Sequence, residues 1–163
     1  MGGIYWIDGP WPGRFAIVER PGTDGEAAAD IAALRQAGID LLVSMLSKGE
    51  AEGLGLADEA AHCARESLDF VWFPVTNLSV PPSENELRLL AESLHERLES
   101  GANVGVHCRF SVGRSGLLAS ALLIAAGAEP EEAFGRVSAA RGAEVPQTDE
   151  QLNWLLDYAR RAR

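Results

Sequence analysis

The chain has 163 residues, 47% of them hydrophobic and 23% charged, which is enough for one buried core but not for two comfortable ones. Its formal net charge of -10 argues against a nucleic-acid-binding surface and against docking on anionic membranes, because both need clustered lysines and arginines. Two cysteines are too few for a disulfide framework and predict a reducing, cytoplasmic location. The first residues lack a signal-peptide pattern, and the longest apolar run, at residues 117–128, is too short to span a membrane.

Strands and helices are predicted to alternate in the first half, from apolar runs separated by turn and capping residues. Thr23 is the expected N-cap of the first helix, and Gly38 is its expected end. The strands predicted at 39–46 and 70–75 are apolar, which suits burial on both faces of a sheet. The predicted elements are strands at 4–7 and 15–18, a helix at 24–37, a strand at 39–46, a helix at 56–67 and a strand at 70–75.

The second half continues this alternation. Ser83 and Glu86 match a capping box, and Thr148 is the expected cap of the last helix. The pattern predicts an α/β fold, a single domain over residues 1–163, whose central, mostly parallel sheet of four to five strands is flanked by helices on both faces. The predicted elements are a helix at 83–100, a strand at 104–107, an apolar helix from 115, a helix at 130–142 and a helix from 149.

A nine-residue loop between the strand at 104–107 and the apolar helix carries the candidate chemistry. In open α/β sheets, ligands bind at the carboxyl edge where such a loop lies. Its N–H groups and the positive end of the next helix can bind a phosphate-sized anion and stabilise a thiolate, so Cys108 is a candidate nucleophile. The competing interpretation is an inert buried thiol. The loop reads His107-Cys108-Arg109-Phe110-Ser111-Val112-Gly113-Arg114-Ser115.

Several loop residues have separate expected roles. Arg114 can make bidentate hydrogen bonds to two phosphoryl oxygens. Ser115 can donate its hydroxyl to the sulfur, and Gly113 lets the backbone bend without a Cβ. Arg109 and Phe110 are expected to line the entrance.

The remaining loop residues are expected to complete the anion site and to tune the Cys108 thiolate. The backbone of Ser111 and Val112 contributes to the anion site, and His107 is expected to hydrogen-bond nearby backbone and tune the thiolate. Cys63 is a candidate resolving thiol, although its helical position favours a plain buried cysteine.

The loop resembles the signature of the protein tyrosine phosphatase superfamily, in particular its compact, dual-specificity-like bacterial and archaeal members. Residues 73–81 are similar to the family's general-acid loop, and residues 145–151 resemble its glutamine segment. The resemblance implies that Cys108 attacks phosphorus while Arg114 holds the oxygens. A water oriented by Gln151, with Gln147, then hydrolyses the cysteinyl-phosphate. It implies no metal and no cofactor.

The chain departs from this pattern at Asn77, where the family has an Asp acid. An amide cannot donate the proton, and general acid catalysis contributes about 10²–10⁴-fold. Three explanations remain open. Asn77 can be an engineered substitution, or Glu50 or Glu52 can supply the acid instead. Alternatively, the domain can hydrolyse only substrates with good leaving groups, or bind phosphate without hydrolysing it. We expect reduced rather than absent activity.

Two functions of different class remain open: a phosphatase for phosphotyrosine, with phosphoserine or phosphothreonine as further substrates, and a phosphate-binding module that sequesters phosphorylated partners. Arsenate reductases and rhodanese-like enzymes also use Cys-x5-Arg loops, but the loop position and ending fit them poorly. The expected partner is a phosphorylated protein or a small aryl phosphate, because phosphoinositide-directed members favour Lys in this loop. No nucleic acid and no membrane is expected to bind, and a monomer is expected.

Overall fold

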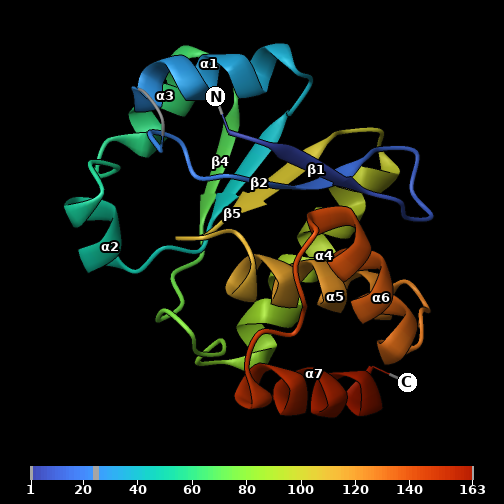
Figure 1. Cartoon of the computed structure of the whole chain (residues 1–163). Coiled ribbons are helices and arrows are strands. Elements are labelled where there is room, and N and C mark those ends of the chain that lie inside the picture. The colour runs from blue at the N-terminus through green and yellow to red at the C-terminus, as the bar shows by residue number, and fades with distance from the viewer. Residues whose placement is uncertain (1, 24–25, 163) are drawn as a thin grey trace.

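The computed structural model describes residues 2–23 and 26–162, and its centre is a five-stranded sheet (Figure 1). The order of the strands is β1-β2-β5-β3-β4, with β1 antiparallel to β2 and every other pair parallel. The predicted single α/β domain with a mostly parallel sheet is therefore confirmed. The strands are β1 (Ile4–Ile7), β2 (Phe15–Val18), β3 (Leu41–Ser44), β4 (Asp69–Trp72) and β5 (Val104–His107).

Helices cover both faces of the sheet, as predicted. Figure 1 shows α1 and α3 on one face and α4 to α7 on the other. Each side has its own apolar cluster, and the central strands β3 and β5 are buried along their whole length because both faces are covered. No helix within residues 2–23 and 26–162 is both long and apolar enough to cross a bilayer. The helices are α1 (Ala27–Gln36), α2 (Lys48–Gly53), α3 (Glu59–Arg65), α4 (Glu84–Glu99), α5 (Gly113–Ala125), α6 (Pro130–Arg141) and α7 (Asp149–Arg161).

The start of the first helix differs from the prediction. The N-cap of α1 is Glu26 rather than Thr23, whose hydroxyl donates to the Arg20 carbonyl 2.8 Å away. Residues 24 and 25, where the helix was expected to begin, lie outside the described residues. Gly38 does end α1, with a φ of +101° that a glycine adopts without strain.

Two further corrections concern the segment between β3 and the loop after β4. The strand predicted at 70–75 is shorter and is not buried: β4 ends at Trp72, which is 48% exposed, because β4 is an edge strand with β3 as its one neighbour. The short helix α2 was not predicted. Its N-cap is Ser47, which forms a capping box with Glu50. The Ser47 side chain accepts a hydrogen bond from the Glu50 N–H, and the Glu50 carboxylate accepts one from the Ser47 N–H.

Candidate active site

The loop after β5 lies at the carboxyl edge of the sheet, where the four parallel strands end. Its first residue, Cys108, is only 2% exposed, and the loop passes directly into α5 at Gly113. Because β2, β3, β4 and β5 run in the same direction, the segments that follow them reach the same place. Each of the segments that follow β2, β3 and β4 contributes a group that contacts the loop or Arg114.

Two arginines hold the loop from its outer side. Arg20, just after β2, donates Nη1–H to the Arg109 carbonyl at 2.7 Å. Arg141, in the last turn of α6, donates Nε–H to the Ser111 carbonyl at 2.7 Å and Nη2–H to the Phe110 carbonyl at 3.3 Å. In a planar trans peptide the next N–H points away from the carbonyl. The N–H groups that follow these carbonyls therefore point away from both arginines, toward the inner side of the loop.

Ser111 fixes the middle of the loop. Its φ of +54° is left-handed, and its hydroxyl donates to the Val18 carbonyl of β2 at 2.6 Å. Such left-handed turns gather successive N–H groups into anion-binding concavities. The N-terminus of the 13-residue helix α5 adds its positive end to the same place. The arrangement can bind a tetrahedral oxyanion beside Cys108.

The buried Arg114 guanidinium is held at this edge by main-chain and side-chain acceptors. Its Nη1 donates to the carbonyls of Met45 at 3.1 Å and Val75 at 2.6 Å, which follow β3 and β4. The Glu50 carboxylate accepts from Nη1 at 2.6 Å and from Nη2 at 2.9 Å, in a bidentate pair. The Asn77 side-chain oxygen also accepts from Nη2, at 3.1 Å. Arg114 is thus positioned beside the loop.

Glu50 is therefore a poor choice for the general acid. Burial acts to raise the pKa of its carboxyl, but the hydrogen bonds from Arg114 and from the Ser47 N–H, with the guanidinium charge, lower it to about 2. A carboxyl with that pKa is ionised at neutral pH and has no proton to donate. Glu52, the other candidate, has a side chain that is 60% exposed and lies 4.0 Å from Lys48. The hypothesis that Glu50 supplies the acid is not supported by this geometry.

Replacing Glu50 by Gln is expected to lower the free energy of unfolding at pH 7 by about 2–3 kcal/mol, because it leaves the buried Arg114 charge without its counterion. The pKa of Glu50 is lowered on folding, so its stabilisation is present above the unfolded pKa and is lost as the pH falls toward about 2. Urea titrations of Glu50→Gln and wild type at pH 7 and pH 3 measure this. Glu52→Gln is the matched control and should change stability little at either pH; an equal loss in both variants would contradict the assignment.

Residues 73–81, which include Asn77, and the glutamine segment at 145–151 both lie beside the segment at 107–115, called here the phosphate loop. The Gln151 side chain is fully buried, donates to the Ser79 carbonyl at 3.2 Å and accepts from the Gln147 N–H at 3.2 Å. A Cβ on Gly113 would lie 2.3 Å from the Gln147 amide oxygen and 3.1 Å from the Gln151 amide nitrogen. Gly113 thus serves the close approach of the two glutamines, rather than the backbone bend predicted from the sequence.

Ser115 has a buried hydroxyl with no hydrogen-bond partner among the described residues. Buried hydroxyls normally have a hydrogen-bond partner, so this one is available for a group that the loop binds or forms.

Cys63 lies away from the loop, in the apolar cluster on the α1–α3 face, and is a free thiol like Cys108. Burial, with a smaller contribution from the Glu59 charge, raises the pKa of Cys63 to about 12, which makes it a poor resolving thiol.

His107 makes the backbone contact expected of it and one contact that was not predicted. Its Nδ1 lies 3.3 Å from the Cys108 carbonyl, and its Nε2 lies 2.5 Å from a carboxylate oxygen of Glu59. Both side chains are buried. Sequence reasoning missed Glu59, Arg20 and Arg141, because no motif relates them to a loop that lies far from them in the chain.

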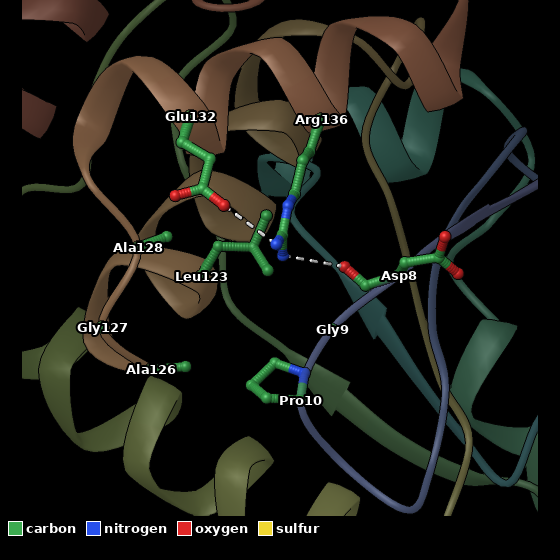
Figure 2. A pocket seen from close by; sticks show the side chains of 9 residues that line it. All are labelled: Asp8, Gly9, Pro10, Leu123, Ala126, Gly127, Ala128, Glu132 and Arg136. Carbon is green, nitrogen blue, oxygen red and sulfur yellow. Dashed lines mark hydrogen bonds and ion pairs between the residues drawn. The ribbon is translucent and has the colours of Figure 1, made fainter.

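A cavity of about 400 Å³ lies at the other end of α5 and is not a plausible substrate site (Figure 2). The 13 residues of α5 separate it from the loop by about 20 Å. Arg136 points into it, but its guanidinium pairs with Glu132 at 2.9 Å and donates to the Asp8 carbonyl at 3.5 Å. The Arg136 charge in this cavity is therefore already paired with the Glu132 carboxylate.

The chain matches a protein-family model over residues 4–161, described as the Swiss Army Knife protein, DSP-PTPase phosphatase domain. No curated protein sequence matches it.

Solved phosphatase structures resemble the whole chain. A kinase associated phosphatase whose catalytic cysteine is substituted by serine aligns with a TM-score of 0.92 at 19% identity, over 99% of this chain and 96% of that one. The active form of Tk-PTP aligns with a TM-score of 0.81 at 24% identity, over 97% of both chains. PTPMT1 in complex with PI(5)P aligns with a TM-score of 0.75 at 16% identity, over 91% of both. At these identities the likeness establishes the shared fold.

Proposed function

Since the chain belongs to the family of Swiss Army Knife DSP-PTPase phosphatase domains, we propose that it hydrolyses phosphotyrosine in proteins, with phosphoserine and phosphothreonine as slower substrates, through a cysteinyl-phosphate on Cys108. The observation that carries this proposal is the loop itself. Its carbonyls are held outward by Arg20 and Arg141, so its N–H groups face the side where a phosphoryl group would meet the sulfur.

In the first step, the Cys108 thiolate forms a bond to phosphorus while the bond from phosphorus to the leaving oxygen breaks. The loop N–H groups and Arg114 hold the other phosphoryl oxygens. The protein contacts of Arg114 use Nη1 and Nη2, so bidentate binding through Nε and Nη2 displaces the Asn77 oxygen from Nη2. Substrate binding therefore breaks the hydrogen bond between Arg114 and the Asn77 side chain.

In the second step, a water molecule attacks phosphorus, the bond to sulfur breaks, and inorganic phosphate and the thiolate are released. Gln151 and Gln147 lie against Gly113, which supports the proposal that they orient this water. The Ser115 hydroxyl can donate a hydrogen bond to the departing sulfur. Asn77 cannot protonate the leaving oxygen of the first step. Aryl phosphates are therefore the favoured substrates, because their aryloxide leaving groups depart readily without a proton.

Replacing Ser115 by Ala is expected to slow breakdown of the cysteinyl-phosphate by about tenfold or more, because the leaving sulfur loses its donor. The unpartnered hydroxyl makes no bond within the described structure, so the variant should remain as stable as wild type. Rapid-quench kinetics with p-nitrophenyl phosphate would then show a burst of nitrophenol followed by slow turnover. A lower rate without a burst would mean that Ser115 acts in the first step instead.

A second candidate function is suggested by Asn77: a module that binds phosphorylated partners without releasing phosphate. The experiment that separates the two is incubation with phosphotyrosine peptide, acid quenching and mass spectrometry of the protein. The phosphatase predicts free phosphate and a phosphoryl group on the peptide that contains Cys108. Binding without either product, also in Asn77→Asp, would support the module.

A further inference from the structure

A pocket of about 250 Å³, called here the α2–α3 pocket, lies between the edge strand β4 and the helices α2 and α3. Its walls are largely apolar and include Leu56, Phe70 and Trp72, together with alanines from both helices. None of residues 107–115 is part of this lining. A space of this size holds a small organic molecule of about eight to ten non-hydrogen atoms, since a molecule of liquid water takes about 30 Å³.

A buried carboxylate also lines this pocket. Glu59 is 3% exposed, and its Oε2 lies 2.5 Å from Nε2 of His107. The other carboxylate oxygen, Oε1, has no hydrogen-bond partner among the described residues. Buried polar atoms normally have a partner, so Oε1 is available to a donor that enters the pocket.

The charge of the lining favours a cation over an anion. Lys48 and Glu52 also line the pocket, but both are largely exposed and lie 4.0 Å apart, so their charges offset each other. Glu59 adds a further negative charge at a place where burial weakens screening by salt. The aromatic faces of Phe70 and Trp72 attract cations as well. The best ligand is therefore a cation with an apolar body.

Both helices that line the pocket carry groups that hold the active site. On α2, Glu50 makes the bidentate pair with Arg114. On α3, Glu59 contacts His107, the residue before the nucleophile, whose Nδ1 lies 3.3 Å from the Cys108 carbonyl. A molecule in the α2–α3 pocket therefore lies against two supports of the phosphate loop without entering it.

We propose that the α2–α3 pocket binds a small organic cation, a primary ammonium group on an aromatic or branched aliphatic body, and that this binding slows turnover at Cys108. The ammonium donates a hydrogen bond to Oε1 of Glu59, while the body packs against Phe70 and Trp72. An ammonium at Oε1 competes with His107 for the Glu59 charge and loosens the imidazole beside the loop. The binding stands by itself, whereas the effect on turnover rests on the proposed function.

The binding test uses two probes of nearly equal shape, 2-phenylethylammonium and the uncharged 2-phenylethanol. Each is titrated into ¹⁵N-labelled protein while the indole N–H signal of Trp72, assigned from the spectrum of Trp72→Phe, is followed by NMR. The dissociation constant of the ammonium is expected to be about 1 mM or lower, and that of the alcohol about tenfold higher. Glu59→Gln should bring the ratio of the two constants close to one. Because the ratio is taken within one variant, a general effect of the substitution cancels.

Ala60 gives an independent variant, because it is exposed, lies on α3 and lines the pocket. Ala60→Leu places a larger side chain in the pocket and should abolish binding of the ammonium. Ala61→Leu makes the same change at the next residue, which is also exposed but is not part of the lining, and should bind as wild type does. The site is overturned if the Trp72 signal of wild type does not respond, if Ala60→Leu binds as well as Ala61→Leu, or if Glu59→Gln keeps the tenfold ratio.

The effect on turnover is measured with p-nitrophenyl phosphate at saturating ammonium. The kcat of wild type and of Ala61→Leu should fall about threefold or more with KM unchanged, and the kcat of Ala60→Leu should not respond. An unchanged kcat in wild type, or a rise in KM alone, overturns the regulatory role. If wild type hydrolyses no p-nitrophenyl phosphate, the proposed function fails, and the NMR titrations still decide whether the α2–α3 pocket binds the cation.

Discussion

Cys108→Ser is expected to lower the rate of p-nitrophenyl phosphate hydrolysis by at least about 10⁴-fold, because a serine hydroxyl at this position does not ionise at neutral pH and cannot replace a thiolate nucleophile. Phosphate binding should survive, since the loop N–H groups and Arg114 do not depend on the sulfur. Steady-state rates and the dissociation constant of a phosphotyrosine peptide, measured on the same preparation, test both statements.

Cys63→Ser is the matched control for this experiment. Cys63 is a free, buried thiol on the opposite face of the sheet and makes no contact with the loop in the described structure. Its replacement should leave the rate unchanged, even if the buried hydroxyl lowers stability. Equal losses of activity in the two variants would mean that neither thiol is the nucleophile and that both substitutions act through folding.

Asn77→Asp is expected to raise turnover, and by an amount that depends on the leaving group. For phosphoserine peptides, whose alkoxide leaves poorly, the gain should approach the roughly 10²–10⁴-fold typical of general acid catalysis at pH values below the pKa of the new carboxyl. For p-nitrophenyl phosphate, which needs no proton, the gain should be small. The position is suitable, because the Asn77 side-chain oxygen already lies 3.1 Å from Arg114 at the edge of the site.

The pH profile provides the decisive measurement for this variant. A general acid acts in its protonated form, so Asn77→Asp should add a limb in which kcat falls as the pH rises through the pKa of the new carboxyl. The nearby Arg114 charge favours the ionised carboxylate and should place that limb at acidic pH. Asn77→Ser, which lacks a carboxyl, should show neither the limb nor the gain. Unchanged rates on phosphoserine peptide in Asn77→Asp would mean that the acid comes from another residue.

Much of this site could be predicted because its chemistry is local in the chain. Cys108 lies in the loop and Gly113, Arg114 and Ser115 follow it in the first turn of α5, so all four belong to one short segment, and the apolar runs on either side predict a buried strand and a buried helix. The roles predicted for these residues stay proposals. The element boundaries were less well predicted: β4 was expected to be buried, because an apolar run does not reveal whether its strand lies at the centre or at the edge of a sheet.

The groups that hold the loop could not be predicted, since each depends on contacts between distant parts of the chain. Glu50 was considered as an acid, whereas its bidentate pair with Arg114, 64 residues away, keeps it ionised. Nothing in the sequence relates Glu59 to His107, 48 residues away.

The sequence alone determined the α/β fold class and the loop in which a thiol, an arginine and a hydroxyl occur together, because hydrophobic pattern and a local motif are properties of neighbouring residues. It also determined that position 77 lacks a carboxyl. Only the tertiary structure decided which charges surround the loop. Arg20 and Arg141 come to it because the segment after β2 and the end of α6 pack against the same sheet edge, where their charges hold the loop carbonyls. That packing also gathers Arg20, Arg109 and Arg141 around one small pocket in a protein whose net charge is -10.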